Sequence, residues 1–362
     1  MAAKPIVHLC EADVAEGLEE IAREELRNKL GRQVTVRQPP AAQALRGIVQ
    51  FTHTGDLRAL TTLKTVQAVF VVKRFAVPRP KALLGDEHFR AILDLIEQAR
   101  STQPDTFRSL YLSAAGSDSS VMRRLKHELS QRTHLVLAEE GDLLVRVRPS
   151  LWARPDTPSS NMTQKDRGWD VLVRLSPRPL ATRSWRVCNF EGALNAAVAH
   201  AMALLTRPTA QDVFLNLACG SGTLLIERLT CAPARLAVGC DMSREALDCA
   251  QRNVAAAGCN AILWQCDGQR LPLADHSVDV VCADLPFGHL VGSHGQNVTL
   301  YPRLLAEAAR VAKPGARFAL ITHEVRLTES LLAASQAWLI DRTVRVELGG
   351  LHPRIYLLRR SG

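Results

Sequence analysis

The chain has 362 residues, a formal net charge of +9, and hydrophobic residues at 47% of its positions. This length predicts two or three globular domains. No run of about 18 uncharged apolar residues occurs, which argues against a transmembrane helix, so we expect no membrane partner. The basic excess favours a polyanionic partner over a small cationic one.

The cysteines and the first residues bear on the compartment. Nine cysteines are present, none forms a C-x-x-C pair, and no Cys or His residues have the spacing of zinc ligands. We therefore expect reduced thiols in the core and no bound metal. The residues Met1-Ala2-Ala3-Lys4-Pro5 contain no apolar signal segment, so we expect a cytoplasmic location.

The first 76 residues alternate strand and helix patterns. Strands are predicted at Val7–Cys10, Gln33–Arg37, Gly47–Phe51 and Ala68–Phe75, and helices at Gly17–Leu26 and Asp56–Leu63. In the first helix the apolar residues recur at helical spacing. This order predicts a small α+β unit of the ferredoxin-like type.

Residues 77–176 form a second predicted α+β unit. Helices are predicted at Asp86–Ala99 and Ser119–Gln131, strands at Phe107–Ala114, Leu135–Leu137 and Leu143–Val147, and a loop at Trp152–Arg167. Four basic residues, Arg123, Arg124, Lys126 and Arg132, lie on or just after the second helix. A basic helix is more often a solvated face, but it is also a candidate RNA-binding surface.

The most informative segment is Val213–Gly222, with the sequence VFLNLACGSG. Its apolar start predicts a buried strand of a parallel sheet, and a helix is predicted from Thr223. Gly220 and Gly222 lie at the turn between strand and helix. Glycines there let the backbone approach a ligand closely, next to the free N–H groups of the helix.

Three further predicted strands end in acidic residues. Asp241 follows the strand Leu236–Cys240 and is placed to hold both hydroxyls of a ribose. Asp267 follows a third strand and Asp284 a fourth. Together these strand ends predict a nucleoside-binding α/β domain. A dinucleotide site is the alternative, although Leu225 stands where that fingerprint requires a third glycine.

This pattern resembles the Rossmann-like class of S-adenosylmethionine-dependent methyltransferases. The helix Tyr301–Ala312, the strand Arg317–Thr322 and a hairpin of Trp338–Leu348 and His352–Arg359 fit the same fold. The resemblance implies S-adenosylmethionine (SAM) as the cofactor. The residues it implies for cofactor binding are Asn216, Ala218, Cys219, Gly220, Gly222, Asp241, Met242, Asp267, Gly268, Asp284 and Asn195, the last within a predicted helix Phe190–Leu205.

Asp284-Leu285-Pro286-Phe287 resembles the (D/N)-P-P-(Y/F) motif of methyltransferases that modify exocyclic amino groups. These four are the candidate catalytic residues. An aromatic amine is a poor nucleophile because its lone pair conjugates with the ring. Asp284 and the Leu285 carbonyl would accept its two N–H groups, while Phe287 would stack on the base. Leu285 replaces a proline of the family motif, which leaves this backbone less rigid. The segment His289–Asn297 after the motif is expected to form a loop.

The segments Gly17–Leu26, Gly47–Phe51, Val69–Arg74 and Arg178–Arg186 resemble those of THUMP-containing RNA methyltransferases. The resemblance implies a Rossmann-like methyltransferase domain at residues 177–362. A ferredoxin-like α+β domain at 1–76 and a THUMP RNA-binding domain at 77–176 would precede it. The implied activity is methylation of guanine N2 in structured RNA, with tRNA as the first candidate. A small activating protein subunit, which some relatives require, is a candidate partner.

Three alternatives stay open at this point. The first is a methyltransferase acting on an amide or amine of a protein, and the second an RNA-binding protein whose methyltransferase domain is a non-catalytic scaffold. The third is a DNA adenine methyltransferase. The intact glycine loop and the strand-end acids argue against a scaffold, and the N-terminal half argues against protein or DNA as the substrate.

Overall fold

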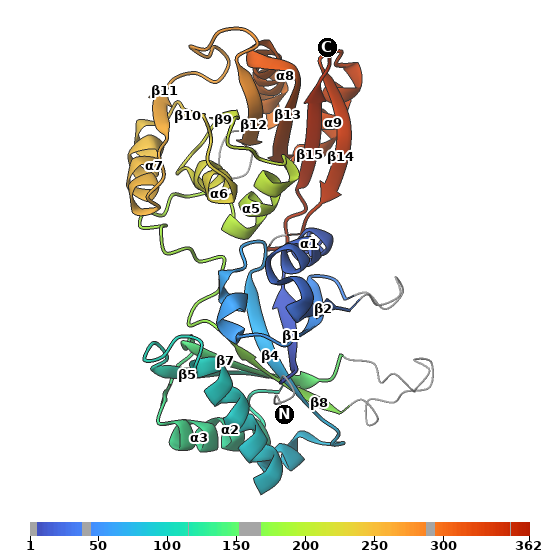
Figure 1. Ribbon diagram of the computed structural model, residues 1–362, viewed down its shortest axis with the longest axis vertical. Coiled ribbons are helices and arrows are strands. Elements are labelled where there is room, and N and C mark those ends of the chain that lie inside the picture. Colours follow the sequence, from blue (N-terminus) through green and yellow to red (C-terminus); the bar gives the residue numbers. More distant parts are fainter. Residues whose placement is uncertain (1–5, 38–44, 115, 152–167, 287–293, 348) are drawn as a thin grey trace. The chain divides into compact units, whose positions relative to one another are not determined.

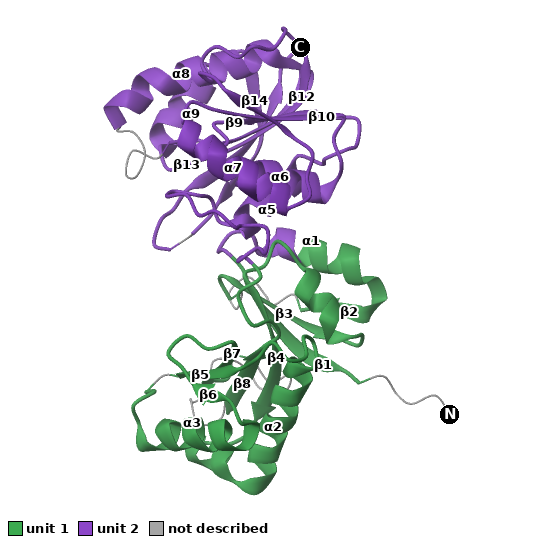
Figure 2. Ribbon diagram, turned by 90° about the vertical axis from the view of Figure 1, so that its left-hand side faces the viewer, with its two compact units in different colours: residues 1–14, 23–180 green, residues 15–22, 181–362 purple. Residues whose placement is uncertain are grey.

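The computed structural model describes residues 6–37, 45–114, 116–151, 168–286, 294–347 and 349–362. Two compact units emerge from the internal contacts of the chain (Figure 2). One comprises residues 1–14 and 23–180, and the other residues 15–22 and 181–362. The predicted loop Trp152–Arg167 and the predicted stacking residue Phe287 lie outside the described residues.

An eight-stranded sheet organises the first unit, in the order β2-β3-β1-β4-β8-β7-β5-β6 (Figure 1). The strands are β1 His8–Asp13, β2 Val34–Val36, β3 Ile48–His53, β4 Ala68–Phe75, β5 Ser109–Ala114, β6 Val136–Leu137, β7 Leu143–Pro149 and β8 Trp169–Arg174. The helices are α1 Glu19–Leu30, α2 Asp86–Arg100 and α3 Ser120–Thr133. Asp56–Leu63, predicted as a helix, contains a 3₁₀ helix at Leu57–Thr62.

The sheet of the first unit runs without interruption through both predicted α+β units. Strand β4 pairs with β8, and β8 pairs with β7, all antiparallel. Strand β8 was missing from the predicted elements. All but its first residue are buried, so it lacks the alternation that identifies a half-buried strand. The division into ferredoxin-like and THUMP domains stays a prediction.

A seven-stranded sheet organises the second unit, in the order β11-β10-β9-β12-β13-β15-β14. The strands are β9 Val213–Leu217, β10 Leu236–Asp241, β11 Ile262–Gln265, β12 Val278–Asp284, β13 Ala312–Thr322, β14 Trp338–Arg345 and β15 Arg354–Arg360. The first five run parallel to one another, the last two form the predicted antiparallel hairpin, and β15 of this hairpin pairs antiparallel with β13.

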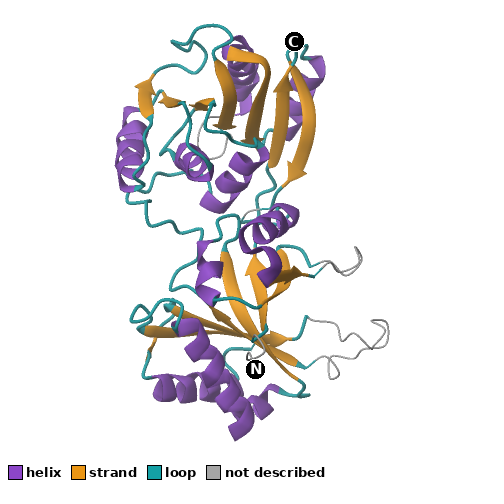
Figure 3. Cartoon of the chain, viewed as in Figure 1, coloured by secondary structure: helices purple, strands orange, loops and turns teal. Residues whose placement is uncertain are grey.

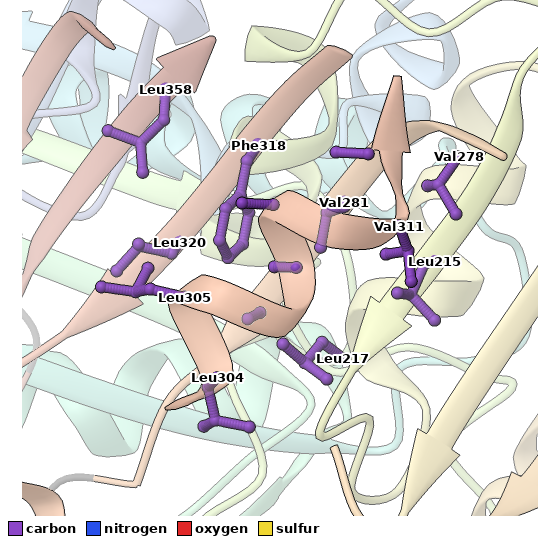
Figure 4. Packing of buried hydrophobic residues seen from close by; sticks show 14 of the residues in the cluster. Leu215, Leu217, Val278, Val281, Leu304, Leu305, Val311, Phe318, Leu320 and Leu358 are labelled. Carbon is purple, nitrogen blue, oxygen red and sulfur yellow. The ribbon is translucent and has the colours of Figure 1, made fainter. Parts of the chain in front are cut away.

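Helices cover both faces of this sheet (Figure 3). They are α5 Ala196–Leu205, α6 Thr223–Cys231, α7 Arg244–Ala256, α8 His294–Val311 and α9 Val325–Ala334. Helices α5, α6 and α7 share one buried cluster with the sheet, and α8 and α9 share the other. Figure 4 shows Leu304 and Leu305 of α8 packing with Leu217 and Phe318 of the sheet. The predicted fold class is confirmed.

Residues 15–22 complete the core of the second unit although they are far from it in sequence. Ala15, Leu18 and Ile21 are buried in the cluster that contains Trp185 and Val346. Gly17 has a φ of +95°, and a Cβ added to it would lie 1.8 Å from the carbonyl oxygen of Arg345. The absence of a side chain at this position is therefore what permits the close approach of the two segments.

Gly17→Ala is expected to lower the free energy of unfolding by about 2–4 kcal/mol, since it combines a backbone clash with a left-handed φ. Gly31→Ala is the matched control because Gly31 has a φ of +53° but no atom within 4 Å of its Cβ position. The control should cost only about 1 kcal/mol. Chemical denaturation measures both values, and equal effects would contradict the role assigned to the Gly17 contact.

Three expectations need correction. Cys188 and Cys249 form a disulfide, so the prediction that all cysteines are reduced is wrong for this pair. The two residues are 61 positions apart, and their proximity arises only when the segment before α5 folds onto α7. Helix α5 begins at Ala196 rather than at residue 190, because Asn195 caps it. Residues 294–297, predicted as loop, belong to α8.

Candidate active site

The strand order of the second sheet creates a topological switch point between β9 and β12, at the carboxyl ends of these strands. From β9 the chain proceeds outward to β10 and β11, then returns to β12 on the other side of β9. Loops that leave the carboxyl ends of β9 and β12 therefore run in opposite directions. In open α/β sheets the crevice between such loops is where ligands bind. The glycine loop after β9 and the Asp284 motif at the end of β12 meet at this point.

The glycine loop has the conformation that its composition predicts. Ala218, Gly220 and Gly222 all have positive φ values, of 50°, 51° and 82°. Gly222 is the N-cap of α6. A Cβ added to Gly220 would meet no atom within 4 Å, so this backbone faces open space. Space beside exposed backbone at a helix start is what a bound nucleoside derivative requires.

Asp241 joins the end of β10 to the glycine loop. Its Oδ2 accepts a hydrogen bond from the Gly220 N–H at 2.8 Å, and its Oδ1 accepts one from the Ser243 N–H at 2.9 Å. Each carboxylate oxygen has two lone pairs, so both retain capacity for a hydroxyl donor. Ser243, and not Asp241, caps α7 through its hydroxyl. These contacts fit the predicted role of Asp241 toward a ribose.

The remaining residues predicted at the cofactor site line the same edge. Met242 is 65% exposed, as a residue contacting a flat ligand would be. Asp267 is exposed, and its Oδ1 accepts from the backbone N–H of Gln269. Gly268 packs so closely that an added Cβ would lie 2.8 Å from Leu217 Cδ1. This close packing holds the turn after β11 against the end of β9.

Two predicted residues have structural partners inside the domain. Asn216 is buried within β9, and its amide donates to the Cys282 carbonyl at 3.2 Å. Asn195 caps α5, accepting from Ala197 and Val198. Arg186 bonds the Leu194 carbonyl and the Thr223 hydroxyl, which ties this segment to the start of α6. Asn195 therefore lies in a segment anchored beside the glycine loop.

Asp284 carries an unusual carboxyl group. Among the described residues its Oδ1 has no hydrogen-bond partner, and this atom is shielded from solvent. Burial raises the pKa of Asp284 to about 8 because the charged form is poorly solvated. Orphaned buried acceptors are costly, and a ligand that donates a hydrogen bond is one way to satisfy such an atom. The orphaned oxygen lies at the carboxyl end of β12, where an amine is expected.

Hydrogen bonds hold the backbone after Asp284 on both sides of the Leu285 carbonyl. Leu285 donates its N–H to the Ile321 carbonyl at 3.1 Å, and its side chain is 2% exposed. The Pro286 carbonyl accepts from the Tyr301 hydroxyl at 2.7 Å and from the Asn297 amide at 3.1 Å. Proline at position 285 could not donate the first of these bonds. The expected loss of rigidity at Leu285 is thus offset by specific contacts.

The predicted RNA-binding residues all belong to the first unit. Arg123, Arg124 and Arg132 of α3 are exposed, and Lys126 is half-buried. Arg124 also pairs with Glu128 at 3.5 Å. Ser119 caps this helix through a side-chain bond to Met122. Three of the four basic side chains are therefore well exposed to solvent and available to a polyanion.

Sequence reasoning missed the residues that support the motif. Tyr301 was predicted only as the first residue of the helix Tyr301–Ala312. Helix α8 instead runs through Pro302 and starts at His294. This earlier start places Asn297 and Tyr301 on the buried side, facing Pro286.

Comparison with known proteins finds a family model that is similar to most of the second unit. Residues 183–354 match the family described as RMKL-like, methyltransferase domain. The tRNA (guanine(6)-N(2))-methyltransferase THUMP3 of Mus musculus is 31% identical over 185 residues, covering 46% of this chain and 36% of that protein. The match thus spans about a third of the length of this relative.

Two comparisons extend over nearly the whole chain. The tRNA (guanine(6)-N2)-methyltransferase of Methanocaldococcus jannaschii is 21% identical over 388 residues, covering 94% of this chain and 97% of that protein. The crystal structure of TrmN from Thermus thermophilus has a TM-score of 0.72 at 22% identity, covering 98% of this chain and 99% of that one. The first unit therefore shares its fold with that structure.

The second unit has the Rossmann-like fold of class I methyltransferases, with a glycine loop and acidic residues at its strand ends. Residues 183–354 are thus similar to the RMKL-like methyltransferase domain, over just under half of the chain. Within the described ranges, no helix is both long and apolar enough to cross a membrane. Over those same ranges no group of three or more His, Cys, Asp and Glu side chains is arranged to hold a metal ion.

Proposed function

We propose that this protein transfers a methyl group from SAM to the exocyclic N2 of a guanine in tRNA. The observation that carries the proposal is the orphaned Oδ1 of Asp284, beside a carbonyl anchored on both sides. Two acceptors at one strand end suit a planar amine with two N–H donors. The similarity to the mouse and archaeal tRNA (guanine-N2)-methyltransferases supports guanine as the base and tRNA as its carrier.

The residues at the switch point fit the cofactor. The open space beside Gly220 leaves room for the methionine portion, and the spare lone pairs of Asp241 suit the ribose hydroxyls. Met242, exposed next to Asp241, would cover one face of the adenine. When bound, SAM supplies an electrophilic methyl group. No step then requires a metal ion or a covalent bond to the protein.

Asp284 and Leu285 would prepare the amine for in-line attack. Bonds from its two N–H groups to the Asp284 carboxylate and the Leu285 carbonyl turn the nitrogen lone pair out of conjugation with the ring. Positioning of this kind accounts for much of the rate of a bimolecular transfer. Asp284 is also the nearest acceptor for the proton that N2 loses after transfer. Phe287 would stack on the base, a contact worth about 1–3 kcal/mol.

The first unit would hold the RNA. Its α3 basic residues would contact phosphates and position the target, while the methyltransferase domain reads the base. A guanine in a paired stem must leave the stack, which costs a few kcal/mol, and backbone contacts offset this cost. We further propose a cytoplasmic location, and a small activating protein subunit as a partner.

Arg123→Ala combined with Arg132→Ala is expected to weaken RNA binding about tenfold and to reduce the salt dependence by about two charges. Arg90→Ala with Arg100→Ala is the matched control, since these residues lie on α2 of the same unit. Titration of labelled tRNA at several salt concentrations measures both pairs. If both pairs weaken binding equally, α3 is not the specific contact surface.

Transfer of labelled methyl from SAM to unmodified tRNA, followed by nucleoside analysis, tests the proposed function. N2-methylguanosine is the expected product. Label in another nucleoside, in ribosomal RNA or in a protein would overturn the assignment of base or substrate. Cofactor binding without transfer to any of these, also in the presence of a candidate activating subunit, would favour a scaffold.

A further inference from the structure

A buried hydrogen-bond network contacts the backbone of the Asp284 motif. It is formed by Asn297 and Tyr301 of α8, Thr322 at the end of β13 and Glu324 just after it. The side chains of Asn297, Tyr301 and Thr322 are completely buried. Both Asn297 and Tyr301 donate to the Pro286 carbonyl. These two donors can occupy both lone pairs of the carbonyl oxygen, so together they fix the direction of this carbonyl group.

The direction of each bond in the network follows from its chemistry. The Pro286 carbonyl can only accept, so the single hydroxyl proton of Tyr301 is committed to it at 2.7 Å. The contact of 2.7 Å between the Tyr301 and Thr322 hydroxyls then has Thr322 as the donor. Thr322 in turn accepts from the Glu324 N–H at 2.9 Å. The network is a one-way chain from the Glu324 backbone to Pro286.

Glu324 orients Asn297 in the same way. The Asn297 amide nitrogen donates to the Pro286 carbonyl and also to Glu324 Oε1 at 3.2 Å. Both partners are acceptors, so only one of the two flip states of this amide satisfies them. His294 occupies the other carboxylate oxygen of Glu324, at 2.9 Å. Each donor aimed at Pro286 therefore has its own support.

We propose that Tyr301 and Asn297 are positioning residues that set the direction of the Leu285 carbonyl toward the target amine. The inference rests on the proposed function of that carbonyl. Leu285 is anchored at its N–H by Ile321, and Pro286 is anchored at its oxygen by Tyr301 and Asn297. The Leu285 carbonyl lies between these anchors in the backbone. The network thus supplies the stiffness that a second proline gives the family motif.

Tyr301→Phe tests this, because it removes one hydroxyl and keeps the volume of the ring. We expect kcat for methyl transfer to fall about 10- to 100-fold, since misplacement by about 1 Å can cost 100-fold. The dissociation constant for SAM and the KM for RNA should change less than about twofold, because the network touches neither site. Tyr301→Phe with Asn297→Ala should lower kcat further. Tyr356→Phe, another buried tyrosine of the same domain, is the control expected to keep the wild-type kcat.

A measurement that needs no substrate tests the positioning role of Tyr301 separately from the proposed function. Hydrogen exchange of the Leu285 amide should accelerate about tenfold in Tyr301→Phe but not in Tyr356→Phe, because loss of one anchor loosens the other. Unchanged exchange and unchanged kcat in Tyr301→Phe would overturn the positioning role. A loss of kcat matched by equal losses of SAM affinity and folding stability would also overturn it. A wild-type protein that methylates no guanine would overturn the proposed function alone.

Discussion

Asp284→Ala is expected to reduce methyl transfer to RNA by a factor of about 1,000 or more while the affinity for SAM changes little. The substitution removes the acceptor that turns the amine lone pair toward the methyl donor, together with the group nearest to the departing proton. Loss of one preorganised catalytic hydrogen bond typically costs about 100- to 1,000-fold in kcat. Single-turnover transfer of labelled methyl, with SAM affinity measured by calorimetry, checks this result.

The variant Asp284→Asn sharpens this test. Its amide oxygen can still accept one N–H of the amine, as the asparagine form of the family motif does, so it should retain more activity than Asp284→Ala. Alanine and asparagine variants with equal, near wild-type rates would contradict the mechanism. A parallel fall in SAM affinity would show instead that the carboxyl group shapes the cofactor site.

The raised pKa of Asp284 predicts how both folding stability and kcat/KM depend on pH. The folded value is about 8 and the ordinary value 3.8, so between them the folded protein holds a proton that the unfolded chain has released. The free energy of unfolding therefore falls as the pH rises from about 4 to about 8. Since only the ionised form of Asp284 can both accept its hydrogen bond from the amine and take up the released proton, kcat/KM should rise with pH toward a plateau above about 8. Asp284→Asn should flatten both profiles.

Asp241→Ala is expected to weaken SAM binding by about 100-fold or more. Each hydrogen bond to a charged group contributes about 1.5–3 kcal/mol, and a factor of ten in affinity corresponds to 1.4 kcal/mol. The variant loses the ribose acceptors and also frees the Gly220 and Ser243 N–H groups that Asp241 holds. Calorimetric titration with SAM measures the effect directly.

Asp248→Ala is the matched control for Asp241→Ala. Asp248 is an exposed carboxylate on α7, paired with Arg244 one turn away and outside the switch point. Its removal should leave SAM affinity within about twofold, since exposed pairs of this kind contribute about 0.3–0.5 kcal/mol. Comparable losses in both variants would mean that Asp241 acts through general charge rather than through its contacts.

Much of the second unit could be predicted from sequence because its signals are local. The buried run before Gly220 and the acids at successive strand ends each mark their element within a few residues. In the first unit, strand β4 was also predicted with its observed bounds, Ala68–Phe75, from its apolar run Ala68–Val72. Where glycine, serine or acidic residues follow an apolar run, the sequence shows both the hydrophobic pattern of the element and the position at which it ends.

The parts that escaped prediction depend on packing between distant segments. Strand β8 has no alternation, since nearly every side chain in it is buried. The Cys188–Cys249 disulfide and the bonds from Tyr301 to Pro286 link positions whose spacing carries no pattern. Helix α8 starts at His294, seven residues before its predicted start at Tyr301, and it continues through Pro302. The candidate site was therefore found by its ligand-facing residues, while its supports were not.

The placement of residues 15–22 in the second unit affects how its gene segment can recombine and how the unit folds during translation. A gene segment for residues 181–362 does not encode a complete hydrophobic core, because Leu18 and Ile21 would be missing beside Trp185 and Val346. On the ribosome, those first apolar residues emerge long before β14 and β15 exist to cover them. The second unit is thus not a segment that recombination can move alone, and its last strands must be made before its first contacts can close.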